Sequence, residues 1–206
     1  MNILKKFYPF EQKPIIRQLV CGDRTLDVFD VNLTVKEYIV CETRAQNMWA
    51  NSKKGQFGIG LINNENDKHK VERIGSVGEM AFAKVFGLCV DFTYLHRGDS
   101  YDFLLFGNKV NIKTSAHNYG KGLIRAITDQ NKALPLTQDI YVFSFVKHDN
   151  CNTKECTVTI VGWETRENIK KLPYTPAIRG SHQNYQINYN NLQSISKLYN
   201  KKAPPP

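Results

Sequence analysis

The sequence predicts a mixed α/β (α+β) fold in which helices flank a central mixed β-sheet, with an N-terminal elaboration on the same core. Apolar or alternating runs bounded by turn residues predict strands in both halves of the chain. Two segments with helical spacing, one opened by a capping box, lie between these runs. The chain has 206 residues, of which 41% are hydrophobic and 11% aromatic. That is enough for one domain with a substantial core, and it argues against a disordered chain.

Residues 1–70 are expected to form N-terminal strands, a capped helix and a mobile loop. The segments "PIIRQLVCG" and "TLDVFDV" alternate as strands or a ribbon do. Thr34 and Glu37 have the spacing of a capping box, and apolar residues recur behind them at helical intervals. Residues 51–70 are rich in Gly, Asn and Lys, a composition that predicts a mobile loop.

Residues 71–200 are expected to form the main core, and residues 201–206 ("KKAPPP") a disordered tail. Residues 75–87 are dense in good helix formers, and Gly87 is placed to cap that helix. The remaining elements are expected at 89–95 (strand), 101–115 (hairpin), 122–127 (strand, with a short helix left open), 139–147 and 156–163 (strands), 164–172 (helix) and 189–199 (helical turns).

The segment "YDFLLFGNKVNIKTS", residues 101–115, reads as an amphipathic hairpin. Gly107-Asn108 is a two-residue turn signal, which would pair Leu104 with Asn111 and Asp102 with Lys113. Because side chains alternate across a strand, this register predicts one polar face made of Asp102, Asn111 and Lys113. The other face would be apolar, with Phe103, Leu105, Val110 and Ile112. The hairpin therefore gathers a carboxylate, an amide and an amine within cross-strand reach.

Composition favours a polyanionic partner. Lys and Arg number 28 against 19 Asp and Glu, a net charge of +9, and such an excess favours nucleic acids. No apolar run approaches the length of about 20 residues that spans a bilayer, so no membrane partner is expected. The N-terminus lacks the pattern of a secretion signal, and the five cysteines form no paired framework. Both features predict a cytoplasmic location.

The three segments "GSVGEMAFAKVFG", "YDF" and "VNIKTS" resemble the core of the PD-(D/E)XK nuclease superfamily, especially its small phage-type and prophage-type members. The resemblance covers residues 73–165. It implies a restriction-endonuclease-like core and a divalent-metal-dependent deoxyribonuclease that hydrolyses phosphodiester bonds in DNA. The metal would be Mg²⁺, with Mn²⁺ as a substitute.

Carried over by position, Glu79 is the helix acid, Asp102 the first strand acid and Lys113 the lysine that orients or activates water. Asn111 stands where the second strand acid belongs. The resemblance implies metal ligation by Glu79, Asp102, Asn111 and the carbonyl of Ile112. It also places the segment after the lysine beside the substrate groove, which implies phosphate contacts from Ser115, His117, Lys121 and Arg125.

The residue types suit that chemistry, because a hard cation binds through oxygen and polarises phosphate and water. Asn111 keeps a ligating oxygen but loses a charge, worth on the order of 8 kcal/mol beside a divalent ion at an effective dielectric of about 20. Three interpretations stay open: a natural variant with some activity, a natural pseudo-nuclease that binds DNA, or an engineered Asp-to-Asn change. A basic interaction or inhibitor protein is the alternative from another class. Monomer and homodimer are both open.

Simpler interpretations exist for each residue. Asp102 or Lys113 taken singly fits a solvated hairpin face, and Glu79 fits an acid in the first turn of its helix. His148, Cys151 and Cys156 are residue types that bind zinc. They lack the paired Cys-x-x-Cys spacing of a zinc site, which favours a loop between two strands. A nucleic-acid contact by Arg44 is left open.

Overall fold

A computed structural model describes residues 6–51, 65–91, 101–128, 132–176 and 182–201. Its central sheet has the strand order β2-β3-β9-β8-β6-β5, with β12 also paired to β9. The pairing of β6 with β8 is parallel and the other pairings are antiparallel, so the sheet is mixed. The strands are β2 (Ile15–Cys21), β3 (Arg24–Leu33), β5 (Phe103–Leu105), β6 (Asn108–Ser115), β8 (Ile140–Asn150), β9 (Glu155–Thr165) and β12 (Gln193–Ser194).

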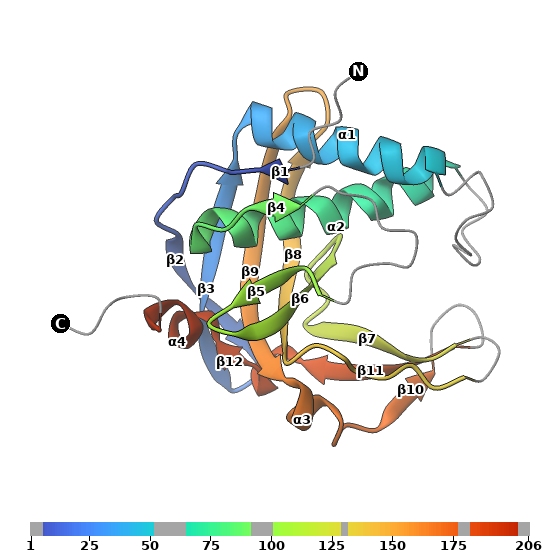
Figure 1. The fold of residues 1–206 in the computed structure, drawn as a ribbon. Coiled ribbons are helices and arrows are strands. Elements are labelled where there is room, and N and C mark those ends of the chain that lie inside the picture. The colour runs from blue at the N-terminus through green and yellow to red at the C-terminus, as the bar shows by residue number, and fades with distance from the viewer. Residues whose placement is uncertain (1–5, 52–64, 92–100, 129–131, 177–181, 202–206) are drawn as a thin grey trace.

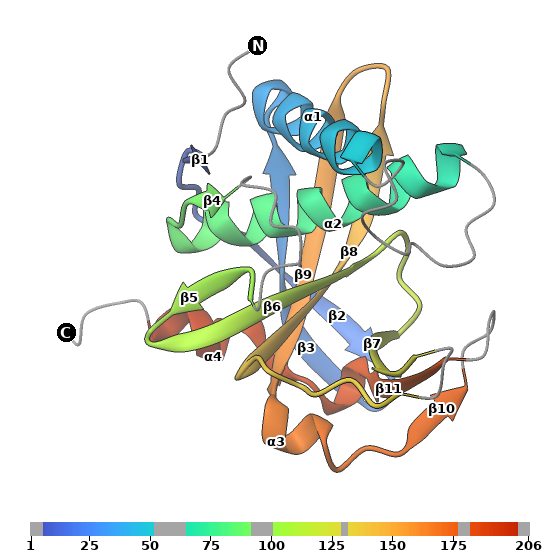
Figure 2. The same cartoon turned by 45° about the vertical axis from the view of Figure 1, so that its right-hand side comes forward.

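Other elements cover both faces of this sheet, and a hydrophobic cluster lies between the sheet and its cover on each side (Figures 1 and 2). Helices α1 (Val35–Asn51), α2 (Glu65–Phe86) and α4 (Ile195–Asn200) pack on one face. The other face is covered by α3 (Arg166–Ile169) and a smaller antiparallel sheet of order β10-β11-β7. The strands of that sheet are β7 (Lys121–Ile127), β10 (Tyr174–Pro176) and β11 (Gln183–Asn188). The predicted class, a central mixed sheet flanked by helices, is confirmed.

The capping box at the start of α1 is confirmed. Glu37 Oε2 accepts the Thr34 N–H at 2.7 Å, and Thr34 Oγ1 accepts the Glu37 N–H at 3.3 Å. The same carboxylate is buried and bonded to the Lys84 ammonium at 2.7 Å, and that ammonium also donates to the carbonyl of Asn32 at 2.9 Å. Glu37 thus caps the start of α1 and also fixes α1 against the C-terminal end of α2.

Helix α2 starts ten residues earlier than the pattern at 75–87 predicted. Residues 65–70 are therefore helical, which corrects part of the loop expected at 51–70, and residues 52–64 lie outside the described part of the chain. Charged residues fit the solvent face of a helix as well as a loop, which is why the composition misled. Glu79 consequently lies in mid-helix, so the first-turn role is wrong. The cap at Gly87 is confirmed by its φ of 66° and by the Leu88 N–H bond to the Ala83 carbonyl.

The hairpin of β5 and β6 exists, but its register differs from the prediction by two residues. Leu105 pairs with Asn108, so the turn residues are Phe106 and Gly107, with φ of 49° and 78°. Two consecutive positive φ values are the signature of a type I′ turn, which the Gly-Asn dipeptide had placed one residue too late. A shift of two preserves side-chain parity. The four apolar residues predicted for the core face are indeed buried.

The remaining elements differ from their predicted ranges mainly in length. Residues 122–127 lie in strand β7, so the helical alternative is wrong. The helix expected at 164–172 shrinks to α3 because β9 continues to Thr165. Residues 189–199 form a 3₁₀ turn (Tyr189–Asn191), β12 and α4. Of the strand expected at 89–95, β4 (Val90–Asp91) is described and pairs with β1 (Lys6–Phe7). The rest of that strand and the tail at 202–206 lie outside the described residues.

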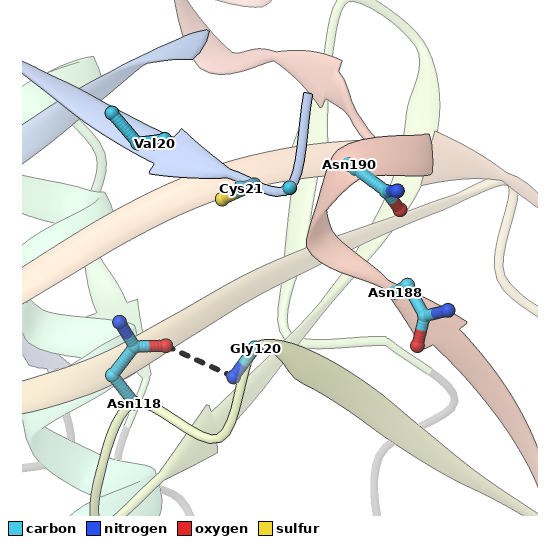
Figure 3. Close-up of a pocket in the computed structure, with 7 residues that line it drawn as sticks. Val20, Cys21, Asn118, Gly120, Asn188 and Asn190 are labelled. Atoms are coloured by element: carbon cyan, nitrogen blue, oxygen red, sulfur yellow. Dashed lines mark hydrogen bonds between the residues drawn. The ribbon is translucent and has the colours of Figure 1, made fainter. Parts of the chain in front are cut away.

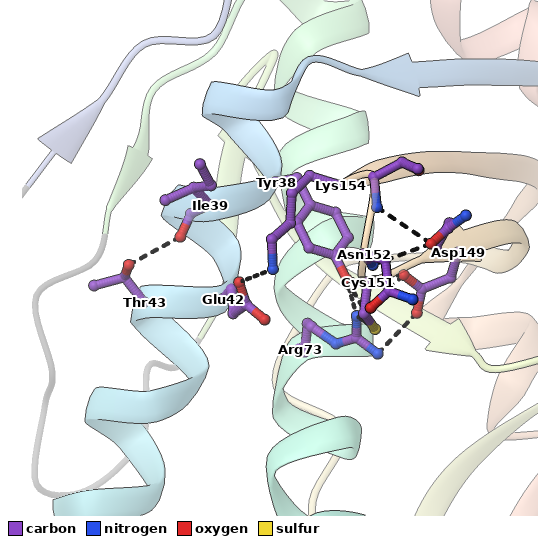
Figure 4. Close-up of polar contacts among 11 residues, drawn as sticks. Tyr38, Ile39, Glu42, Thr43, Arg73, Asp149, Cys151, Asn152 and Lys154 are labelled. Atoms are coloured by element: carbon purple, nitrogen blue, oxygen red, sulfur yellow. Dashed lines mark hydrogen bonds and ion pairs between the residues drawn. The ribbon is translucent and has the colours of Figure 1, made fainter.

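The β8–β9 hairpin is fixed to both long helices by a polar cluster (Figure 4). Asp149 accepts from the Tyr38 hydroxyl at 2.9 Å and forms an ion pair with Arg73 at 2.8 Å. Cys151 is exposed at the turn, whereas Cys156 is buried, and burial raises its pKa to about 12. The interpretation of this segment as a loop between two strands is confirmed. Among the residues described, no group of three or more His, Cys, Asp or Glu side chains is arranged to hold a metal.

Candidate active site

The candidate site lies where the middle of α2 meets strand β6 and the residue before β5. The meeting depends on Gly78, since a Cβ added there would lie 1.7 Å from Thr114 Oγ1. Only a glycine lets the helix backbone approach the strand this closely. Gly78 immediately precedes Glu79, and Thr114 immediately follows Lys113. The close approach therefore brings the helix acid and the strand lysine to the same place.

Asp102 sits at the centre of this arrangement. Its Oδ2 accepts the Ile112 N–H at 2.6 Å, and its own N–H donates to the Val110 carbonyl at 2.9 Å. Burial raises the pKa of Asp102 to about 7, with a further increase from the nearby Glu79 carboxylate. The Ile112 hydrogen bond and the charges of Lys113 and Arg44 oppose that increase. A carboxyl group in this position exchanges its proton near neutral pH.

Lys113 interacts electrostatically with both acids. Burial lowers the pKa of its ammonium, while the charges of Asp102 and Glu79 act in the opposite direction. These mutual interactions place Glu79, Asp102 and Lys113 within electrostatic reach of one another, as strand parity predicted for the last two. A partly desolvated lysine gives up a proton more readily than an exposed one.

Asn111 faces the same side of the hairpin. Asn111 and Lys113 are two residues apart on β6, so their side chains lie on the same face of that strand. The Asn111 Oδ1 atom is buried and accepts no hydrogen bond from any residue that the structure describes. Buried polar atoms are nearly always satisfied, so such an oxygen calls for a water or an ion as its partner.

Two charged residues join the cluster that the sequence did not assign to it. Arg44 of α1 forms an ion pair with Glu79 at 2.5 Å between Nη1 and Oε2, with both side chains less than one-fifth exposed. Glu72 lies two turns before Glu79 on α2 and interacts with both residues of that pair. Burial raises the pKa of Glu72, and the Glu79 charge adds to it. Residues seven apart lie on the same face of a helix, two turns from each other. Glu72 would therefore have been predictable from Glu79 if the earlier start of α2 had been recognised.

The residues present fit a divalent cation in donor type. Glu79 and Asp102 offer carboxylates, and the orphaned Asn111 Oδ1 offers a neutral oxygen, a ligand set that suits a hard ion. Two of these three groups are acids, and the third is a neutral amide. Ile112 contributes its N–H to Asp102. Ligation by the Ile112 carbonyl stays a prediction.

The four residues expected to contact phosphate lie beyond Lys113 along the chain. Ser115 donates to the carbonyl of His117 at 2.6 Å, and the exposed His117 ring meets the edge of Tyr119. Lys121 and Arg125 share one face of β7, where Arg125 is exposed. They belong to the smaller sheet rather than to the acid cluster. A role in binding nucleic acid stays a prediction for all four.

A separate cavity of about 290 Å³ lies past the end of β6 (Figure 3). Three asparagines, two glycines, a cysteine and a valine line it: Asn118, Asn188, Asn190, Gly22, Gly120, Cys21 and Val20. Asn118 uses its Oδ1 to accept the Gly120 N–H at 3.0 Å. The lining contains neither the acids nor Lys113, so this cavity is distinct from the candidate site.

No protein-family model, curated protein sequence or solved structure matches the chain. No helix in the described part of the chain is long and apolar enough to cross a membrane.

Proposed function

We propose that this protein is a divalent-metal-dependent endonuclease that hydrolyses phosphodiester bonds in DNA, with metal affinity reduced by Asn111. The observation that supports this most is the mutual electrostatic interaction of Glu79, Asp102 and Lys113, with the orphaned Asn111 oxygen two residues before that lysine on β6. These residues come from α2, from β6 and from the position before β5, which are separated in sequence. A fully solvated hairpin face would not bring them together and partly bury them.

The chain's own groups divide the chemistry between them. Bound Mg²⁺ or Mn²⁺ would polarise the phosphate and acidify a water. Glu79, Asp102 and Asn111 would hold that ion through oxygen. Lys113 would orient the attacking water beside the phosphate, and its lowered pKa suits it to receive and release a proton at Nζ. The net charge of +9 favours a polyanionic substrate.

A pseudo-nuclease that binds DNA without cutting it is the second candidate. The Arg44–Glu79 ion pair favours it, because a cation of the protein already satisfies one predicted ligand. Asn111 favours it as well, since the site lacks one acid.

Restoring the missing acid separates the two candidates. In Asn111→Asp, both Mn²⁺ affinity and Mg²⁺-dependent cleavage of plasmid DNA should increase by orders of magnitude over the starting protein. Adding Lys113→Ala to that variant should abolish cleavage and leave most DNA binding, because the lysine acts at the reacting phosphate. If Asn111→Asp leaves metal binding and cleavage at background, the nuclease proposal is wrong.

A further inference from the structure

Arg44 has the position of a counter-ion inside the candidate site. It comes from α1, outside the hairpin and α2 that supply the other groups. Its guanidinium bonds Glu79 at 2.5 Å and also interacts with Asp102, the other predicted acidic ligand. An exposed surface pair contributes little, but this pair is largely buried on both sides. Arg44 therefore neutralises the acids that a metal would bind.

The charges of the cluster favour this interpretation. Glu72, Glu79 and Asp102 are the acids, and Arg44 and Lys113 are the cations that interact with them. With Arg44 in place, the Glu79 carboxylate is paired and the site has little attraction for a divalent ion. With Arg44 withdrawn, Glu79 is released and one positive charge leaves the cluster, which favours the entry of a cation.

We propose that Arg44 is a built-in substitute for the metal: it occupies Glu79 while the site is empty of metal and has to leave Glu79 when a divalent cation binds. This inference rests on the proposed nuclease function. It makes Arg44 a residue that sets the metal affinity of the site, in addition to the shortfall caused by Asn111. Arg44 and the metal compete for one carboxylate, so their binding is mutually exclusive there.

The test is Mn²⁺ titration by calorimetry, in the absence of DNA, on the full chain. Arg44→Gln should bind Mn²⁺ about tenfold or more tightly than the starting protein, because a nearby positive charge is gone. Arg44→Lys keeps the charge and should bind about as weakly as the starting protein. Lys154→Gln is the matched control: it removes the ion pair between Lys154, at the β8–β9 turn, and Glu42 of α1, at 3.0 Å (Figure 4). Lys154 is not among the charges that act on Glu72, Asp102 or Lys113. It should leave Mn²⁺ affinity unchanged.

Thermal unfolding supplies a second readout that needs no activity. Without metal, Arg44→Gln should unfold at a lower temperature than the starting protein, because Glu79 loses its buried partner. Added Mn²⁺ should restore most of that loss. An equal loss with and without Mn²⁺, or an unchanged Mn²⁺ affinity in Arg44→Gln, would show a merely structural ion pair and overturn the proposal.

The outcome for Asn111→Asp separates this inference from the proposed function. If Asn111→Asp binds Mn²⁺ and cleaves DNA while Arg44→Gln gains no affinity, the metal-substitute role of Arg44 is wrong and the nuclease function stands. If Asn111→Asp, Arg44→Gln and the double variant all fail to bind Mn²⁺, both are wrong.

Discussion

Asp102 illustrates how burial alters a single group. The folded protein raises its pKa from 3.8 to about 7, chiefly because ionisation is unfavourable away from water. The folded chain therefore keeps a proton at pH 5 or 6 that the unfolded chain has released. Linkage gives the sign: stability is highest below the unfolded pKa and decreases as pH rises toward 7.

The first prediction follows from this linkage. In EDTA, the free energy of unfolding should decrease between pH 4.5 and 7, with Asp102 contributing up to about 1.4 kcal/mol per pH unit. The neutral isostere Asp102→Asn should flatten that slope. Asp23 is exposed, so Asp23→Asn should leave the slope unchanged. Denaturant titrations across this pH range measure it, and an equal slope in Asp102→Asn would contradict it.

Phe106 gives a second prediction at the residue scale. It has a φ of 49° in the type I′ turn, a conformation that costs an ordinary L-residue about 1 kcal/mol or more and that Asn adopts more easily. Its side chain is half exposed, so little packing is lost on substitution. Phe106→Asn should raise the free energy of unfolding by about 0.5–1 kcal/mol, and the β-branched Phe106→Val should lower it. A less stable Asn variant would argue against this turn.

At the scale of elements, the contact between α2 and β6 positions the site. Gly78→Ala would place a methyl group against Thr114 Oγ1, so the helix has to move away from the strand. Overpacking of this kind costs about 1–3 kcal/mol. The shift also separates Glu79 from Lys113, so the variant should lose Mn²⁺ affinity along with stability in an Asn111→Asp background.

The same helix contains its own control. Gly75 lies three residues earlier, and a Cβ there would have nothing within 4 Å. Gly75→Ala should therefore stabilise the protein by up to about 1 kcal/mol through helix propensity. Unfolding curves of the two variants test the contact. Equal effects at the two positions would mean that the close approach does not constrain the helix.

At the scale of the whole molecule, the excess of basic residues governs association. A chain of net charge +9 should bind DNA with an affinity that decreases steeply with salt, because each neutralised phosphate releases counterions. Fluorescence anisotropy with a short labelled duplex, from about 50 to 200 mM NaCl, should give a linear log–log plot of negative slope. Replacing the exposed Arg125 of β7 by Ala should make that slope shallower by about one. A DNA affinity that does not change with salt concentration, or no DNA binding at all, would favour the interaction-protein alternative.

The sequence was sufficient where local chemistry and burial agree. The capping box at Thr34 and Glu37 predicted the start of α1, and strand parity predicted the buried face of β5 and β6. Parity is robust because a slip of two residues returns every side chain to its own face. The exact register was not recoverable in the same way: Phe106 occupies a left-handed position that its type rarely adopts, so the turn signal pointed one residue too late.

The sequence by itself determined the mixed α/β class, most of the elements, and the nearness of Asp102 to Lys113. These depend on periodicity and on residue type, which are local properties. Only the tertiary structure decided that Arg44 and Glu72 belong to the acid cluster, and that Asn111 Oδ1 is buried without a donor among the described residues. Those facts depend on how closely α1 and α2 approach each other and the sheet. That approach is set by packing between segments far apart in the chain, such as Gly78 against Thr114, which no single stretch of sequence encodes.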